Sequence, residues 1–438
     1  MTEFAVSTPP FGRWKNGLCW LLLLGPLFFL TYGQVNQYTA ARPDVGGSVF
    51  SWEHAIPFMP WTIVPYWSID ILYGISLFIG SSKQELTRHG YRLLAASLIA
   101  CCGFLLFPLK FTFVRPDTEG IFGWLFRQLA QFDLPYNQAP SLHIILTWLL
   151  WLRFRQHLSG LPAKTISGAW FLLIALSVLT TWQHHVIDVI SGVITAVIIS
   201  YAIPMTGRWC WRRPSAQAVR LSALYTASGM VLLSVGLTIP YGEIALWPAL
   251  STLIVAVGYA GVGVGVFQKN AQGRLSLSAR ILLLPYLAGA RLSKYMFCRR
   301  LPHTSAIHGG IYLGAFPLTE VQQSAVLDLT AEFHRVAPSV WHACPLMDLV
   351  APDERTLYQC VMTLNQLRQS HETVLVCCAL GLSRSAVVVA AWLLAERIVS
   401  NVQDAVELTS AHRPQVVLTP RHLRVLEQFQ ERLCRTAR

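Results

Sequence analysis

Long apolar runs recur through the first two thirds of this chain and constrain its fold more than any other feature. They lie at about residues 18–33, 56–80, 93–113, 142–154, 169–182, 186–204, 221–239 and 244–266. A helix needs roughly 20 apolar residues to cross a bilayer, and a chain with 53% hydrophobic and 13% charged residues is too apolar for an ordinary soluble enzyme. We therefore expect a polytopic helical membrane domain with about eight transmembrane helices, the first of which is retained rather than cleaved as a signal peptide.

Positively charged residues between these runs predict the orientation in the membrane. If the amino terminus is cytoplasmic, twelve Lys and Arg residues lie on the inner side and four on the outer side, as the positive-inside rule requires. Eight spans then return the carboxyl terminus to the cytoplasm. We expect a multi-pass protein of the inner membrane with both termini in the cytoplasm.

The net charge of +12 belongs to the apolar part of the chain, because residues 300–438 hold twelve Arg and twelve acidic residues. This basic surplus indicates contact with membrane lipids rather than with nucleic acid. The ten cysteines are scattered and show no metal-ligand spacing. We therefore expect no metal, no cofactor and no disulfide framework.

Beyond about residue 300 the apolar runs become short, which predicts a soluble α/β domain. GGIYLGAF, AVLDLTAEF and ETVLVC are typical of strands, and VMTLNQLRQS, SAVVVAAWLLAERI and RHLRVLEQFQERL of helices. The preceding segment is interrupted by Pro285 and contains the basic residues Arg280, Arg291, Lys294, Arg299 and Arg300. It is expected either to lie at the surface of an anionic leaflet or to serve as a linker.

The stretch CCALGLSRS at 377–385 joins the apolar strand TVLVC to the helix SAVVVAAWLL. Such a turn directs backbone N–H groups and the positive end of a helix at one point, and so forms an anion site. Gly381 permits close backbone approach, and Arg384 can hold two phosphate oxygens at once. The positive field favours the thiolate of Cys378 as a nucleophile, and the reducing cytoplasm keeps that thiol free.

These residues resemble the loop H-C-x5-R-S/T of the cysteine-dependent protein tyrosine and dual-specificity phosphatases, over about residues 305–435. The resemblance implies that Cys378 attacks phosphorus and that Ser385 helps the thiolate leave. The phosphoryl oxygens would be held by Arg384 and by the loop residues Ala379, Leu380, Gly381, Leu382 and Ser383. Cys377 replaces the histidine of the family, which keeps open a sensor that binds a phosphorylated ligand without turnover.

A general acid must also protonate the leaving oxygen. Asp348, in ACPLMDLVAP, lies thirty residues before Cys378 on a predicted loop between a strand and a helix. The resemblance places the acid of the family there, so we assign this role to Asp348, with Asp353 as the rival.

Three stretches of the membrane half carry polar residues at the predicted outer ends of spans: KFTFVRP at 110–116, PSLH at 140–143 and QHHVID at 183–188. Together they supply a lysine and an arginine for phosphate, two histidines for nucleophile and acid, and an aspartate four residues after His184 that can orient it. A histidine or a charge at the end of a span can also simply face water.

This set resembles the type-2 phosphatidic acid phosphatase superfamily, with motifs K-x6-R-P, P-S-G-H and S-R-x5-H-x3-D, over about residues 55–205. The spacing of the first motif, Leu142 in place of glycine and Val178 in place of arginine resemble the branch of inositol phosphorylceramide synthases more closely. The implied roles are nucleophile for His184, acid for His143, orientation of His184 for Asp188, and phosphate binding for Lys110, Arg115 and Ser141.

The sequence thus predicts a polytopic α-helical membrane domain followed by a cytoplasmic α/β cysteine-dependent phosphatase domain, in a bacterial inner-membrane fusion. The expected divisions are an amino-terminal helix and outer loop (1–54), the phosphatidic acid phosphatase-like domain (55–205), two further spans (206–270), a basic interfacial linker (271–304) and the phosphatase domain (305–438).

The predicted function is hydrolysis of phosphate monoesters, either of a phospholipid or of a phosphoprotein, with a second histidine-dependent lipid phosphatase-like site at the outer face. Two alternatives stay open. The membrane half could instead transfer a lipid head group, and the cysteine loop could act only as a sensor.

Overall fold

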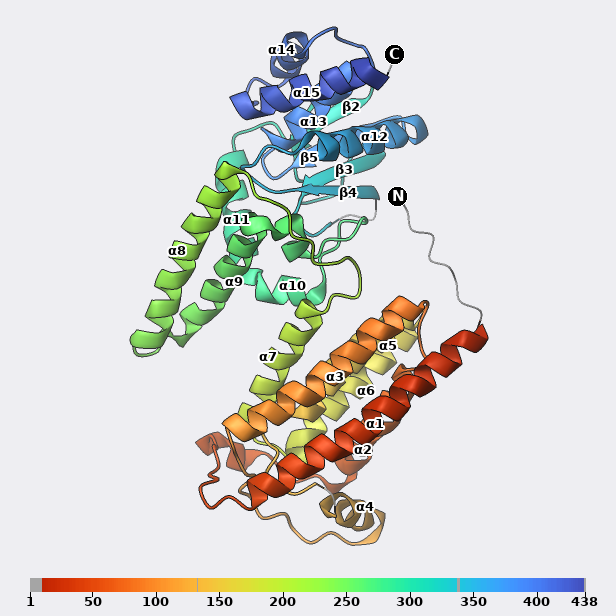
Figure 1. Cartoon of the computed structure of the whole chain (residues 1–438), viewed down its shortest axis with the longest axis vertical. Helices are drawn as coiled ribbons and strands as arrows, with labels where there is room; N and C mark the ends of the chain where they lie inside the picture. The colour runs from red at the N-terminus through yellow and green to blue at the C-terminus, as the bar shows by residue number, and fades with distance from the viewer. Residues whose placement is uncertain (1–9, 132, 337–338, 437–438) are drawn as a thin grey trace. The chain divides into compact units, whose positions relative to one another are not determined.

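The computed structural model describes residues 10–131, 133–336 and 339–436. It divides into two compact units, Met1–Met205 and Thr206–Arg438, which are described separately (Figure 1).

The first unit is a helical bundle. Its helices are α1 (Pro10–Ala40), α2 (Ile63–Ser76), α3 (Lys83–Leu106), α4 (Gly120–Ala130), α5 (Leu142–His157), α6 (Leu161–Thr180) and α7 (Val186–Ala202). Leu93 and Phe104 of α3 meet Ile145 and Leu149 of α5 in a core whose side chains are almost completely buried. Burial of these apolar surfaces holds α3 and α5 together, and the loops that carry the polar motifs lie at the helix ends.

Five helical segments of the described residues are long and apolar enough to cross a membrane: 14–40, 83–106, 161–180, 216–238 and 242–267. The chain is therefore a membrane protein. Helix α2, with 14 residues, is shorter than the apolar run at 56–80 from which a span was expected. Eight spans and their orientation stay predictions.

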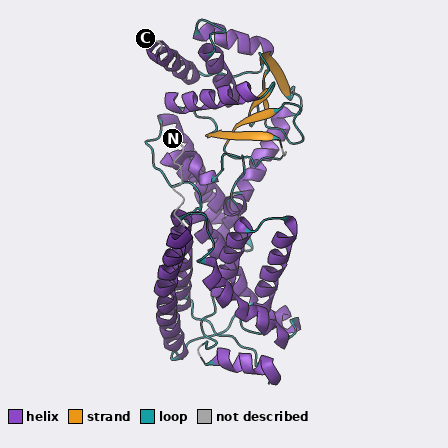
Figure 2. Ribbon diagram, turned by 90° about the vertical axis from the view of Figure 1, so that its right-hand side faces the viewer, coloured by secondary structure: helices purple, strands orange, loops and turns teal. Residues whose placement is uncertain are grey.

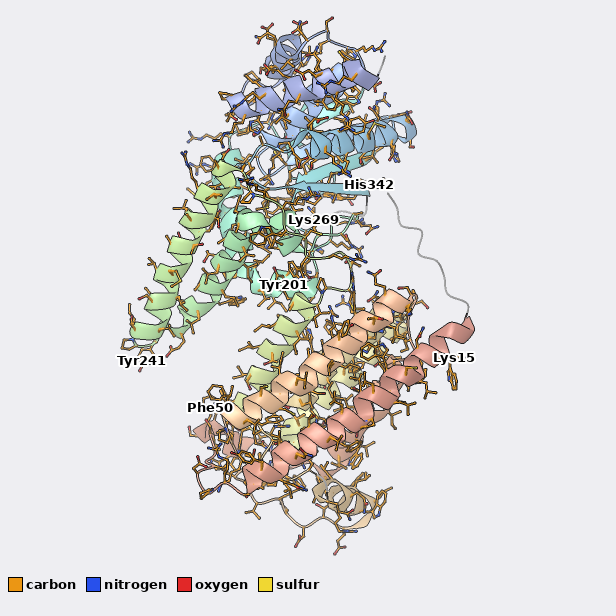
Figure 3. The ribbon with its side chains drawn as sticks, in the orientation of Figure 1. Lys15, Phe50, Tyr201, Tyr241, Lys269 and His342 are labelled. Carbon is orange, nitrogen blue, oxygen red and sulfur yellow. The ribbon has the colours of Figure 1, made fainter. Side chains whose placement is uncertain are left out.

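The second unit opens with a helical hairpin. Helix α8 (Ala216–Thr238) turns at Tyr241, through η3 (Gly242–Ala245), into α9 (Leu246–Val257), which continues into η4 (Gly258–Val262) and η5 (Gly263–Phe267). Figure 3 shows Tyr241 at the tip of this hairpin. A Cβ atom at Gly229 would lie 2.7 Å from Leu253 Cγ, so the glycine lets the two helices approach closely.

Two further helices, α10 (Leu277–Leu282) and α11 (Leu284–Cys298), lead from the hairpin to the sheet. Pro285 lies in the first turn of α11, where the missing N–H costs nothing, so the proline separates the two helices.

A five-stranded mixed sheet follows, with strand order β1-β2-β5-β3-β4. Its strands are β1 (Thr304–His308), β2 (Ile311–Ala315), β3 (Ala325–Thr330), β4 (Val340–Leu346) and β5 (Val374–Cys378). Only β1 is antiparallel to its neighbour. The remaining helices are α12 (Glu354–Ser370), α13 (Arg384–Ala395), α14 (Val402–His412) and α15 (Pro420–Thr436), and Figure 2 shows the strands between helices.

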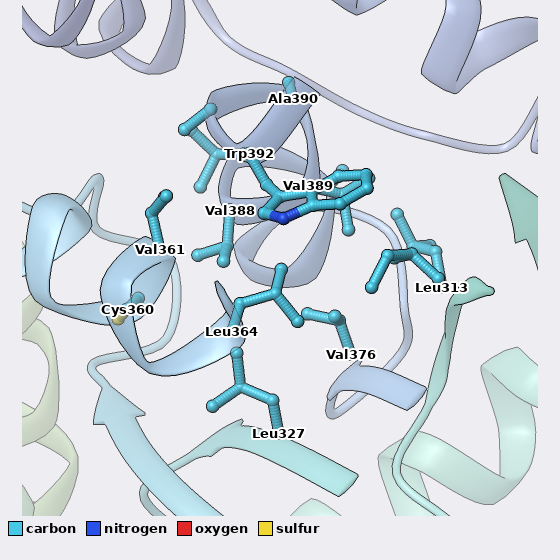
Figure 4. Close-up of a cluster of buried hydrophobic side chains, with 14 of the residues drawn as sticks. Leu313, Leu327, Cys360, Val361, Leu364, Val376, Val388, Val389, Ala390 and Trp392 are labelled. Atoms are coloured by element: carbon cyan, nitrogen blue, oxygen red, sulfur yellow. The ribbon is translucent and has the colours of Figure 1, made fainter. Parts of the chain in front are cut away.

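Alternate residues of the central strands face opposite sides of the sheet. On one side Leu327 and Val376 pack against Leu364 of α12 and Val388 of α13 (Figure 4). On the other side Val326, Leu375 and Cys377 pack in a second cluster that Ala290 of α11 joins. Both faces of the sheet are therefore covered, and the central strands β3 and β5 are buried throughout.

The α/β domain predicted from the sequence is confirmed, and so is the helical character of the part before it. Three strands and three helices lie where the apolar patterns placed them. Strand β1 and helices α4 and α14 were not identified from the sequence.

Candidate active sites

The cysteine loop has the strand-turn-helix form that its sequence predicts. Cys378 is the last residue of β5, and Arg384 is the first of α13. Gly381 adopts φ +71°, and a Cβ atom there would lie 2.4 Å from the carbonyl carbon of Gly314. The position therefore requires glycine both for its backbone conformation and for its contact with β2.

Residues between positions 413 and 422 form hydrogen bonds with the cysteine loop. Arg413 Nε donates to Gly381 O (2.8 Å), and Val417 N donates to Leu382 O (2.8 Å). Ser383 Oγ lies 3.3 Å from His422 Nε2. The N–H and C=O groups of one peptide point in opposite directions. Because the carbonyls of Gly381 and Leu382 are bonded to residues outside the loop, the N–H groups of the same peptides point away from those residues, as they do in anion-binding nests. Ala379 packs against the cluster of Phe316, and Leu380 O lies 4.0 Å from Cys298 Sγ.

Arg384 is the centre of the polar network. Its Nη2 and Nη1 atoms donate to the two carboxylate oxygens of Glu332 at 2.6 and 3.1 Å, and Nη1 also donates to Leu346 O at 3.0 Å. Asp348 Oδ1 lies 3.1 Å from Arg384 Nη2. Ser385 Oγ lies 3.2 Å from Cys378 Sγ. The structure therefore brings Cys378, Arg384, Ser385 and Asp348 together.

The charges of this network stabilise one another. Burial acts to lower the pKa of Arg384, but the charges of Glu332 and Asp348 outweigh it and raise that pKa. Burial likewise acts against the Glu332 carboxylate, whereas the charge and hydrogen bonds of Arg384 lower its pKa overall. Both side chains therefore stay ionised. By contrast, burial raises the pKa of Cys377, which packs in the same cluster as Val326 and Leu375, so its thiol stays neutral.

The two candidate acids have different surroundings. The side chain of Asp348 is 45% exposed and faces Arg384. Asp353 instead caps α12 by accepting from Thr356 N at 2.7 Å, and it lies 3.8 Å from Arg212. The capping bond accounts for Asp353 without a catalytic role.

Glu332 and Arg413 were not identified from the sequence. Both are buried charged side chains, with exposures of 4% and 0%. A signal existed for Glu332, which lies two residues after the apolar strand AVLDLT, because a charge beside a buried strand needs a partner. No comparable local pattern marks Arg413.

The membrane unit contains the histidine and aspartate pair that was predicted. His184 Nδ1 lies 3.5 Å from Asp188 Oδ2, and Ser141 N donates to Asp188 O at 3.0 Å. With its amide nitrogen turned toward acceptors, Gln138 donates to Gln183 O (3.0 Å) and to Asp188 Oδ2 (3.1 Å), and this nitrogen also lies 3.3 Å from His184 Nδ1. One buried cluster at the amino-terminal ends of α5 and α7 thus contains Gln138, Ser141, His184 and Asp188.

The other predicted residues of this half lie in several settings. Arg115 stacks 4.7 Å from the ring centre of Phe126, and its Nη2 donates to Trp182 O at 3.4 Å. His143 stacks on Tyr66 with ring centres 3.9 Å apart. Lys110 is exposed, and its backbone N–H donates to Gly46 O.

His185, which sequence reasoning passed over, is also bonded on both sides. Its Nδ1 atom lies 3.0 Å from Glu53 Oε2, and Thr112 N donates to its Nε2 at 3.2 Å. Glu53 is 1% exposed and also accepts from Val186 N. This pair ties the loop that carries Lys110 and Arg115 to the start of α7.

Among the described residues, no group of three or more His, Cys, Asp or Glu side chains is arranged to hold a metal ion.

Comparison with known families agrees with both resemblances predicted from the sequence. Residues 311–432 match the family described as dual specificity phosphatase, catalytic domain. Residues 63–203 match the PAP2 superfamily. Both are phosphatase families. The chain thus joins a region that matches the PAP2 superfamily to a carboxy-terminal region that matches the dual specificity phosphatase family, as its motifs predicted.

Individual relatives cover only part of the chain. An uncharacterized protein of Methanocaldococcus jannaschii is 29% identical over 166 residues, which is 34% of this chain, and the match spans 64% of that relative, less than two thirds of its length. Among solved structures, Tk-PTP in the active form is 23% identical over 30% of this chain and 99% of its own (TM-score 0.28). PTPMT1 in complex with PI(5)P is 21% identical over 31% and 100% (TM-score 0.29). Human DUSP28 is 20% identical over 30% and 96% (TM-score 0.28).

Proposed function

We propose that the carboxy-terminal domain hydrolyses a phospholipid monoester through a phosphocysteine intermediate. The observation that carries this proposal is that Asp348, from a different loop, lies beside Arg384, while Ser385 lies beside Cys378. The carbonyl of Gly381 in the cysteine loop is bonded to Arg413, outside the loop.

The geometry supports a two-step mechanism. Arg384 and the loop N–H groups bind the phosphoryl oxygens. The Cys378 sulfur forms a bond to phosphorus while the bond from phosphorus to the leaving oxygen breaks, and Asp348 gives its proton to that oxygen. Water then attacks phosphorus and gives a proton back to Asp348. The sulfur–phosphorus bond breaks, and Ser385, 3.2 Å from the sulfur, donates to the departing thiolate.

Arg413 holds the loop in which Cys377 replaces the histidine of the family. Its Nε donates to Gly381 O at 2.8 Å, and its Nη1 donates to Ser305 Oγ at 3.2 Å. These bonds fix the loop backbone beside Cys378 and so support binding of a phosphate there.

A lipid substrate is favoured because the phosphatase domain shares its compact unit with an apolar hairpin. Leu224, Val231 and Leu237 of α8 are each more than 60% exposed, as expected for side chains that face acyl chains. Anchoring to a membrane raises the local concentration of membrane substrates at the site. Both the hairpin and the tethering thus favour a substrate held in the membrane.

The test is phosphate release by the purified full chain in vesicles, from a panel of phospholipid monoesters and from a phosphotyrosine peptide. We expect lipid turnover that Cys378→Ser abolishes. Turnover of the peptide but of no lipid would contradict the lipid assignment. Binding of a phosphorylated ligand without release of phosphate would favour the sensor.

We further propose a second phosphate-transfer site in the membrane unit, at the outer face, on the strength of the His184 and Asp188 pair. Asp188 faces Nδ1 of His184, which leaves Nε2 to attack phosphorus. His143 would give its proton to the leaving oxygen as the bond from phosphorus breaks. Arg115, Lys110 and Ser141 would hold the phosphate.

Hydrolysis and head-group transfer at this second site give different products. With a labelled lipid phosphate, a hydrolase releases labelled free phosphate or phosphoalcohol, whereas a transferase leaves the label on a second lipid. Either product must disappear in His184→Ala and persist in Cys378→Ser. Loss in both variants would contradict two separate sites.

A further inference from the structure

The loop that carries Asp348 has an unusual backbone. It follows β4, and Leu349, directly after Asp348, adopts φ +58° although it is not glycine. L-residues rarely adopt this conformation, and they keep it only where surrounding contacts impose it. The side chain of Leu349 is 60% exposed, so its own packing cannot supply those contacts.

The contacts come from the helical hairpin of the same unit. Tyr259 of η4 donates from its hydroxyl to Asp348 O at 3.0 Å. Gln217, in the first turn of α8, donates from Nε2 to Leu349 O at 2.5 Å. The carbonyls on both sides of the strained φ and ψ angles are therefore bonded to the hairpin.

Both donors are themselves held in place. The Tyr259 ring is 3% exposed and stacks on Tyr225 of α8, with ring centres 5.5 Å apart and ring planes 6° from parallel. Gln217 Oε1 accepts from Arg421 of α15. A Cβ atom at Gly258 would lie 3.5 Å from Met347 Cε, so the backbone of η4 lies against the residue before Asp348.

We infer that Tyr259 and Gln217 are positioning residues for the general acid, through which the membrane hairpin sets the orientation of Asp348 toward the phosphate site. This inference rests on the proposed function, because it takes Asp348 as the acid. When the hairpin contacts hold the loop, the carboxyl group is fixed beside Arg384 and can deliver its proton to the leaving oxygen. Without them the loop relaxes, and the phosphorus–oxygen bond must break without that proton.

The test uses the dependence on the leaving group. A general acid matters for an alkyl phosphate, whose leaving alkoxide is strongly basic, and much less for an aryl phosphate with an acidic phenol. The variants are Tyr259→Phe and Gln217→Leu of the full chain in vesicles. The control is Tyr241→Phe, which removes a hydroxyl that is 93% exposed at the hairpin tip.

We expect each variant to lower kcat for the alkyl phosphate about tenfold and to change kcat for the aryl phosphate less than about twofold, with the control unchanged on both. An equal fall on both substrates, or no fall on either, would overturn the inference. Gln217 is only partly buried at the start of α8, so its variant decides the question if Tyr259→Phe fails to fold. If Asp348→Asn shows no dependence on the leaving group, or Cys378→Ser keeps activity, the proposed function fails instead.

Discussion

Arg384 and Glu332 face each other as a buried bidentate pair, with Nη2–Oε1 and Nη1–Oε2 distances of 2.6 and 3.1 Å. Arg384 Nε is buried and has no hydrogen-bond partner among the described residues. The carboxylate therefore fixes the plane of the guanidinium, and this plane determines where a phosphate can bind.

Replacing Glu332 by Gln tests this relationship. The amide puts an N–H donor against the guanidinium and leaves a buried charge uncompensated, which typically costs about 3–5 kcal/mol of stability. We expect a lower free energy of unfolding and weaker binding of a phosphate mimic such as tungstate. Glu354→Gln is the matched control, because Glu354 pairs with Arg432 at 3.0 Å in a half-exposed setting, where the loss should stay below about 1 kcal/mol. Equal effects of the two substitutions would contradict the assigned role.

Replacing Gly381 by Ala separates backbone strain from steric contact. Gly381 and Gly309 both adopt positive φ, at +71° and +52°, but a Cβ atom would lie 2.4 Å from Gly314 C in the first case and 3.9 Å from Trp392 in the second. Gly309→Ala should therefore cost about 1–2 kcal/mol. Gly381→Ala should cost more and abolish phosphate release through Cys378. Wild-type activity of Gly381→Ala would show that the loop does not need this close approach.

Lys269, which is labelled in Figure 3, lies before the sheet in the sequence but pairs with a residue of β3. Its replacement tests whether the segment before the sheet is part of the folded phosphatase domain. Its ammonium group is fully buried, 2.5 Å from Asp328 Oδ2 and 2.7 Å from Thr330 O. Lys269→Met should destabilise the second unit by about 3–5 kcal/mol, because Asp328 stays buried without its partner. Adding Asp328→Asn should recover part of this loss. The free energy of unfolding is measured with urea. If Lys269→Met alone is as stable as the wild type, the segment before the sheet is only a linker.

How much the sequence predicts depends on how far apart the interacting residues are. The cysteine loop is contiguous, so strand, turn and helix patterns suffice to place Cys378, Arg384 and Ser385. Glu332 is 52 residues from Arg384, and Tyr259 is 89 residues from Asp348. Such pairs meet only when the strands and the hairpin have packed, and no local periodicity reports that packing. The shortness of α2 has a similar origin, because apolar composition does not show where a helix gives way to a packed loop.

His334 predicts a pH dependence of stability. Burial, followed by the charges of Arg280, Arg274, Lys269 and Arg291, lowers its pKa from 6.5 to about 4. The unfolded chain therefore binds a proton below pH 6.5 that the folded chain refuses until about pH 4. Stability should fall as the pH decreases through this window and be independent of His334 below it.

Protonation at Nδ1 would also break the bond that this atom accepts from Leu275 N at 3.0 Å. Thermal unfolding at several pH values between 7 and 4 provides the measurement. His334→Gln should flatten the profile within the window, and an unchanged slope would contradict the assignment.

The two adjacent histidines of the membrane unit should respond differently to substitution. His184 faces Asp188 and presents Nε2 to the proposed phosphate site, whereas His185 is bonded on both sides, to Glu53 and Thr112. His184→Ala should therefore abolish product formation by this unit, with a loss in kcat, because the atom that attacks phosphorus is gone.

His185→Ala should instead loosen the loop of Lys110 and Arg115, which raises KM and leaves kcat within about tenfold of wild type. Glu53→Gln is the matched variant, because it weakens the same contact from the other side, and it should reproduce the effect of His185→Ala. Steady-state assays on vesicles, with Cys378→Ser in the background to silence the carboxy-terminal site, separate these outcomes. If His185→Ala removes kcat while His184→Ala keeps it, the nucleophile is His185, and the Glu53 carboxylate takes the orienting role assigned to Asp188.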